Sequence, residues 1–129
     1  MNVIQIILVA AFCYLGSIGS IVGNTFGWYT LGRPLIASLV VGLIMGDVQT
    51  AMVVGIPLQI MYMGNVTPGG AVAWDLSYAT YIGVTGALVF GSGMDTTGII
   101  GLGVVFAGIG GWLGYFLGGC DGLLYALLA

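Results

Sequence analysis

The sequence predicts an all-α integral membrane protein, a multi-span helical bundle that contains a re-entrant helical hairpin. Of its 129 residues, 60% are hydrophobic, 25 are glycine and 4% are charged, and the mean hydropathy is +1.18. A soluble domain carries about 25% charged residues, so this chain could not cover its surface with solvated side chains. Intrinsic disorder goes with low hydrophobicity and high charge, and the composition excludes it too. We expect one multi-pass membrane domain over residues 1–129, in the cell inner (plasma) membrane.

Three stretches are expected to cross the bilayer. Residues 3–23 carry no charge over a length that matches the ~20 residues of a spanning helix. They lack a basic start and are too long for the core of a signal peptide, so we expect a retained helix. Residues 98–118 form a second full-length span, and residues 76–91 can cross if tilted or slightly extended. The last ten residues, CDGLLYALLA, are read as the opening of a further segment.

The stretch from 34 to 63 predicts the re-entrant hairpin. Its first twelve residues form a helix of about 18 Å, too short to cross. Gly46 can end that helix with a positive φ, and Asp47 is a natural N-cap for the next one. The second piece contains Pro57, which has no N–H for the carbonyl of residue 53. Such backbone is tolerated at membrane depth only where protein covers it or water reaches it.

Several polar side chains lie close together in the sequence, at the end of this hairpin and in a polar, glycine-rich loop at 64–75. Amides, hydroxyls and aromatic rings hold an uncharged polyol by hydrogen bonding and stacking. The candidate substrate-binding residues are Gln59, Asn65, Thr67 and Asp75. Gln59 could instead hydrogen-bond a neighbouring helix, which is worth about 0.6–2 kcal/mol. Asp75 either lines a polar pathway or caps the helix that follows it.

The remaining charged residues are interpreted as topology anchors, helix caps or solvated loop residues. Arg33 is the one basic residue and an anchor for topology, and it weakly favours a cytoplasmic position for the loop before the hairpin. Asp47 is read as a cap more than as a ligand, and Asp95 and Asp121 as solvated loop acids.

No catalytic, metal or cofactor site is expected. The chain has no histidine, hence no imidazole base and no phosphohistidine, and no phosphate-binding loop with its lysine. Cys13 and Cys120 are expected to be small hydrophobic residues within the bundle. A net charge of −3 excludes a nucleic-acid partner. Any phosphoryl chemistry must therefore be done by a partner.

The segment GRPLIASLVVGLIMGDVQTAMVVGIPLQIMYMGNVTPGGAVAWD, residues 32–75, closely resembles the sugar-channel (IIC) subunit of the mannose/sorbose-type phosphotransferase systems. Gln5 also resembles a recurring polar position of that family, and the likeness covers 1–118 loosely. The matching elements are Arg33-Pro34-Leu35, Gly46-Asp47 with Thr50, Leu58-Gln59, Met63-Gly64, Gly69-Gly70-Ala71 and Asp75.

This resemblance implies a membrane sugar-permease subunit that binds and translocates a hexose or related sugar. It implies a second membrane subunit (IID), a trimer of such pairs, and a soluble IIB domain that phosphorylates the sugar after being charged by IIA. It places Gln59, Asn65 and Asp75 near the sugar, and Gln5 less firmly. Many members have Glu at Gln59 and Pro at Trp74, so the identity of the sugar stays open.

Members of that family are longer, so the likeness is to their N-terminal half. A truncated product, a natural half of a split subunit and a degenerate remnant all stay open. The alternative from another class is a non-transporting membrane oligomer packed through its glycines.

Overall fold

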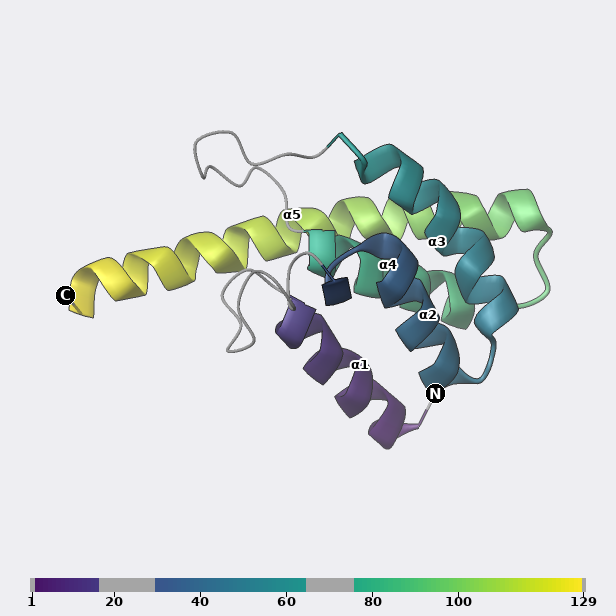
Figure 1. The fold of residues 1–129 in the computed structure, drawn as a ribbon, viewed down its shortest axis with the longest axis horizontal. Helices are drawn as coiled ribbons and strands as arrows, with labels where there is room; N and C mark the ends of the chain where they lie inside the picture. The colour runs from purple at the N-terminus through teal and green to yellow at the C-terminus, as the bar shows by residue number, and fades with distance from the viewer. Residues whose placement is uncertain (1, 17–29, 65–75, 129) are drawn as a thin grey trace.

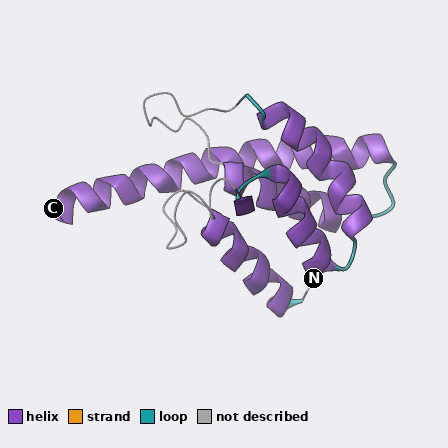
Figure 2. Ribbon diagram, viewed as in Figure 1, coloured by secondary structure: helices purple, strands orange, loops and turns teal. Residues whose placement is uncertain are grey.

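The computed structural model describes residues 2–16, 30–64 and 76–128, and the side chains of all of these except 118–126. The described residues form α-helices and no strand, which confirms the all-α prediction (Figures 1 and 2). In chain order the helices are α1 (Val3–Gly16), α2 (Pro34–Met45), α3 (Val48–Tyr62), α4 (Leu76–Phe90) and α5 (Thr96–Leu128).

Helices α2 and α3 are joined by a two-residue turn at the positions that the sequence predicts. Gly46 has φ 81°, a left-handed conformation that glycine adopts at no steric cost, and its N–H returns to the carbonyl of Gly42. Asp47 caps α3, since its Oδ1 accepts the N–H of Thr50 at 3.1 Å. Both residues therefore end and begin helices as the sequence predicts.

Helix α3 continues through Pro57 instead of breaking there. The proline removes one donor, for the carbonyl of residue 53, but the helix runs on for five residues beyond it. Burial accounts for this: Val54 and Leu58, on either side of the proline, are fully buried. Packing of this face offsets the single hydrogen bond that the proline removes.

Helix α4 occupies the centre of the bundle, because it contacts each of the other four helices. Its packing against α5 is close at Gly83. A Cβ at Gly83 would lie 2.8 Å from the carbonyl oxygen of Gly103 and 2.9 Å from Cβ of Ala107. The glycine thus allows the two backbones to approach, as small residues do in membrane helices.

Helix α5 is longer than expected and corrects one prediction. Residues 120–128 continue α5 to Leu128 instead of opening a further segment, so Asp121 lies in a helix and not in a loop. Its 33 residues span about 50 Å, and Figure 1 shows the C-terminal part projecting past the other helices. No proline follows Thr96, and each glycine costs a helix only about 1 kcal/mol, so nothing in the sequence ends it earlier.

The surface of the bundle is strongly apolar. Large hydrophobic side chains are exposed on every helix, among them Ile4, Leu43, Ile60, Phe90 and Trp112. Soluble monomers rarely expose contiguous apolar surface of this extent, whereas a bilayer covers it. Among the described residues, one stretch, Thr96–Leu117, has the length and the hydropathy to cross a membrane. The other helices are shorter, with 12 to 15 residues each. The span expected at 3–23 is described only as far as Gly16.

Candidate functional site

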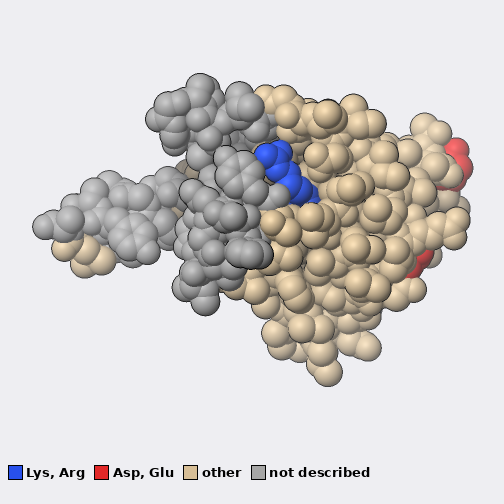
Figure 3. Space-filling view, viewed as in Figure 1, with Lys and Arg blue, Asp and Glu red and all other residues tan. Residues whose placement is uncertain are grey.

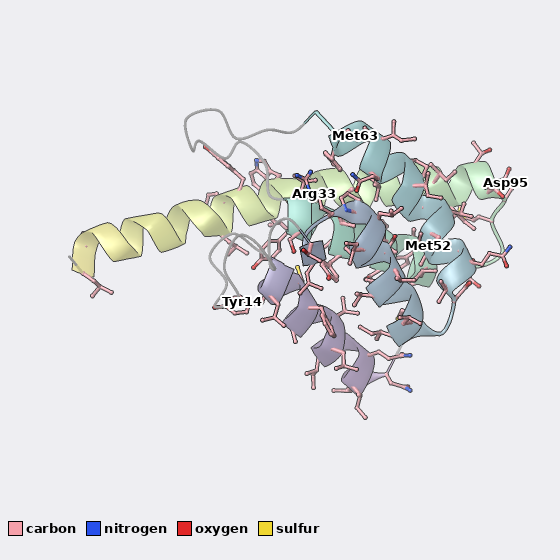
Figure 4. The ribbon with its side chains drawn as sticks, viewed as in Figure 1. Tyr14, Arg33, Met52, Met63 and Asp95 are labelled. Atoms are coloured by element: carbon pink, nitrogen blue, oxygen red, sulfur yellow. The ribbon has the colours of Figure 1, made fainter. Side chains whose placement is uncertain are left out.

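Three hydrogen bonds bring the C-terminus of α1, the start of α2, the end of α3 and the start of α4 to one end of the bundle. The Ser77 hydroxyl on α4 donates to the carbonyl of Cys13 on α1 at 2.8 Å. The Tyr81 hydroxyl donates to the carbonyl of Leu31, just before α2, at 3.1 Å. The third bond joins α3 to the first turn of α2. We call this end the Arg33 end, after the residue that precedes α2; Met63 lies there too (Figure 4).

The third bond is made by Gln59, the principal candidate residue. Its Oε1 accepts the N–H of Leu35 at 3.3 Å. This N–H belongs to the first turn of α2, where backbone donors have no partner inside the helix. Arg33, at the N-cap position, makes no side-chain capping bond, and Pro34 has no N–H to offer. Gln59 therefore caps α2 from the neighbouring helix.

That bond also determines what the rest of the Gln59 side chain can do. With Oε1 engaged, the amide plane is held and the Nε2 group becomes the outward donor. Within the described part of the chain, this Nε2 makes no hydrogen bond. Gln59 is half-buried, so its Nε2 can donate to an uncharged ligand with hydroxyl oxygens.

Gln5 lies at the opposite end of α2. Its Nε2 donates to the carbonyl of Ile44 at 3.1 Å, and its Oε1 accepts the N–H of Asn2 at 2.9 Å. Leu35 and Ile44 are nine residues apart, which is about 13 Å along a helix. The structure thus does not bring Gln5 and Gln59 together. Both ends of the Gln5 amide are used inside the protein.

The described charges separate between the two ends. Arg33 marks one end, and Asp47 and Asp95 lie at the other, as the blue and red atoms in Figure 3 show. Asp47 lies in the turn between α2 and α3, where its Oδ1 accepts the N–H of Thr50 at 3.1 Å. Asp95 is exposed and caps α5, because its Oδ1 accepts the N–H of Gly98 at 3.2 Å. Both acids therefore begin helices, and the described residues hold no cluster of metal ligands.

The other candidates, Asn65, Thr67 and Asp75, lie outside the described residues, as does Trp74. The described residues on either side of this stretch are Gly64, after α3, and Leu76, the first residue of α4.

A cavity lies elsewhere, between α1, α4 and α5. It measures about 510 Å³ and its walls are almost wholly apolar, with residues such as Val9, Ile82 and Phe106. The hydroxyl of Thr85 is buried beside it with no hydrogen-bond partner in the described residues. A sugar needs several polar partners, so this cavity does not fit one. Cys13 lines it as a buried apolar residue, as the sequence predicts.

The structure has the bond from Gln59 to a neighbouring helix that the sequence analysis gives as the alternative to sugar binding, but the sequence did not show that both glutamines cap the ends of α2. One signal for this capping was present. Arg33 stands before Pro34 in the place where Ser, Thr, Asp or Asn would normally cap a helix. A short helix without its own cap, in a chain with few polar residues, requires a polar partner from elsewhere.

Comparison with known proteins gives a family match over almost the whole chain. Residues 3–124 match the family described as PTS system sorbose-specific IIC component. The chain is 33% identical to the mannose-specific EIIC component of Escherichia coli K12 over 82 residues, 64% of this chain and 29% of that protein. It is 32% identical over 82 residues to the sorbose-specific EIIC component of Klebsiella pneumoniae, with the same two shares.

A third relative, the putative N-acetylgalactosamine permease IIC component 2 of Escherichia coli K12, is 32% identical over 105 residues. That alignment covers 80% of this chain and 77% of the relative. The match thus covers 29% of the length of the mannose- and sorbose-specific relatives. It covers 77% of the length of the N-acetylgalactosamine relative.

Proposed function

The chain belongs to the family of sorbose-specific IIC components of the phosphotransferase system, and from this premise we propose that it is a sugar-translocating subunit of such a system in the cell membrane. The observation that carries the proposal is the geometry of Gln59. Its oxygen is held by the first turn of α2, and its nitrogen is left as a donor at the Arg33 end.

The lengths of α2 and α3 support a re-entrant path for the hairpin. With 12 and 15 residues they reach about 18 and 22 Å, short of the ~30 Å hydrocarbon core. A helix that ends at membrane depth must satisfy its terminal N–H and C=O groups within the protein. Gln59, Gln5 and Asp47 supply those partners to three of the four helix ends in the hairpin.

The substrate in this proposal is an uncharged hexose or related sugar. Gln59 donates to a sugar hydroxyl, and Asn65, Thr67 and Asp75 complete the polar lining from the stretch that follows α3. Gln5, predicted as a further contact, has both ends of its amide engaged at the far end of α2, and we assign it to that helix end.

The chemistry of phosphorylation is assigned to partners, because the chain has no histidine to carry a phosphoryl group. The partners proposed are a IID membrane subunit and soluble IIA and IIB phosphocarriers, with assembly as a homotrimer of membrane pairs. The names of the relatives give the sugars to test first: mannose, sorbose and N-acetylgalactosamine.

The test uses Gln59→Leu, with Gln49→Leu as the matched control. Gln49 is exposed on the same helix, so its loss changes an amide without touching the capped end. Both variants are expressed with the phosphotransferase components of the source cell in a host that lacks its own. Gln59→Leu should abolish phosphoenolpyruvate-dependent uptake while insertion into the membrane is unchanged, and Gln49→Leu should transport normally.

Two results would overturn the proposal. Normal uptake by Gln59→Leu would remove Gln59 from the sugar path. Absence of uptake by the unmodified chain, for every sugar tested and with every component present, would favour the alternative of a non-transporting oligomer packed through its glycines.

A further inference from the structure

The contact between Ser38 on α2 and Gly55 on α3 lies one helical turn from the bond between Leu35 and Gln59. Ser38 is fully buried. A Cβ built on Gly55 would collide with both Cβ and Oγ of Ser38, and would lie 3.3 Å from the carbonyl oxygen of Pro34. The two helices therefore approach each other here as closely as a bare glycine permits.

Ser38 also holds Leu35 directly. Its hydroxyl donates to the carbonyl of Leu35 at 2.9 Å and lies 3.4 Å from Sδ of Met52 on α3. The N–H of Leu35 donates to Gln59. The backbone N–H of Leu35 is thus held by Gln59, and its backbone carbonyl is held by Ser38.

The spacing of these four residues couples the two contacts. Gly55 and Gln59 are four residues apart on α3, and Leu35 and Ser38 are three apart on α2, so each pair shares a helix face. A change in the separation of the helices at Ser38 and Gly55 is passed on to Leu35 and Gln59. The bond there is 3.3 Å long, and it ceases to be a hydrogen bond at about 3.6 Å. A displacement of a few tenths of an ångström is enough to break it.

We propose that Ser38 and Gly55 are positioning residues: by setting the distance between α2 and α3, they hold the amide of Gln59 in the orientation that presents its nitrogen to the sugar. The inference rests on the proposed function for the role of Gln59, but the geometry that it describes can be measured without a sugar.

The test begins with Gly55→Ala and with a compensating pair, Ser38→Gly together with Gly55→Ala. In the pair, the glycine stands on α2 and the side chain on α3, so the close approach of the helices is kept. Gly108→Ala is the control, because a Cβ at Gly108 meets nothing within 4 Å. The chain has three glutamines, Gln5, Gln49 and Gln59, so selective ¹⁵N-glutamine labelling gives three side-chain NH₂ signals. The Gln59 signal is assigned by its absence in Gln59→Leu.

In Gly55→Ala the Gln59 signal should move and the Leu35 amide should exchange faster with solvent, while the Gln5 and Gln49 signals stay in place. The KM for sugar uptake should rise about fivefold, the equivalent of one neutral hydrogen bond of about 1 kcal/mol. The maximal rate should change less than KM. The compensating pair restores the spacing of the helices but not the bond from the Ser38 hydroxyl to Leu35, so it should bring the Gln59 signal and KM most of the way back to their unmodified values. The control should leave all three signals unchanged.

Each failure has its own reading. Unchanged Gln59 signals and KM in Gly55→Ala overturn the inference and leave the proposed function standing. A moved Gln59 signal in a chain whose unmodified form transports no sugar supports the coupling and overturns the function. If Gly55→Ala does not fold, the compensating pair decides: a Gln59 signal close to its native position supports the inference, and a strongly displaced one overturns it.

Discussion

Replacing Gln5 by leucine tests the role assigned to the far end of α2. The change removes the hydrogen bond from Nε2 to the carbonyl of Ile44 and the bond that Oε1 accepts from the N–H of Asn2. Leucine keeps most of the side-chain volume, so the main effect is the loss of polar partners. The Ile44 carbonyl is among the last four of α2, which have no donor inside the helix.

The expected cost follows from the environment of that carbonyl. Hydrogen bonds between membrane helices average about 0.6 kcal/mol and reach about 1.7 kcal/mol. Asn2 is exposed, so its N–H can find another partner and adds little. We expect α1 to be held to the bundle less tightly by about 1 kcal/mol, a factor of about five in the population of undocked α1.

Hydrogen exchange along α1, in a bilayer or detergent, measures this directly. Gln5→Leu should speed exchange in α1 about fivefold and leave sugar uptake close to normal. Gln49→Leu, on an exposed surface, should change neither. Loss of uptake in Gln5→Leu without faster exchange in α1 would refute the reasoning, because it would place Gln5 in contact with the sugar.

Two further predictions concern helix packing and capping. Gly83→Ala should lower the free energy of unfolding in detergent by roughly 1–3 kcal/mol, because the new Cβ would press on α5. Gly108→Ala is the control and should not, because a Cβ there faces open space. Equal stability of the two variants would contradict the close approach of α4 and α5. Asp47→Ala should speed exchange of the Thr50 amide. Asp47→Asn keeps an oxygen that can accept this N–H, so it should slow that exchange again. Equal exchange of the Thr50 amide in the unmodified chain and in Asp47→Ala would show that the carboxylate is not the cap.

Local signals in the sequence were enough to predict α2, α3 and the turn between them. Pro34 at a helix start, Gly46 with Asp47 at the turn, and the apolar runs between them each act within a few residues, and the structure has both helices and the turn at those positions. The cap made by Asp47 follows from the same short-range chemistry.

What the sequence could not predict depends on contacts between distant residues. The bond between Gln59 and Leu35 joins residues 24 apart, and that between Gln5 and Ile44 joins residues 39 apart. A sequence pattern shows that these amides are unusual in an apolar chain but not which helix end each one meets. The continuation of α5 to Leu128 was missed for another reason: Gly118 and Gly119 resemble an end, yet glycine weakens a helix without stopping it.

The most direct test of the central claim is a sugar titration of the ¹⁵N-glutamine-labelled chain, purified from membranes with the subunits that accompany it. Mannose, sorbose and N-acetylgalactosamine are each added while the three side-chain NH₂ signals are followed. The account predicts that one of these sugars moves the Gln59 signal to saturation and leaves those of Gln5 and Gln49 in place. A saturable shift of the Gln5 signal alone, or no shift of the Gln59 signal with a sugar that the same preparation transports, would contradict it.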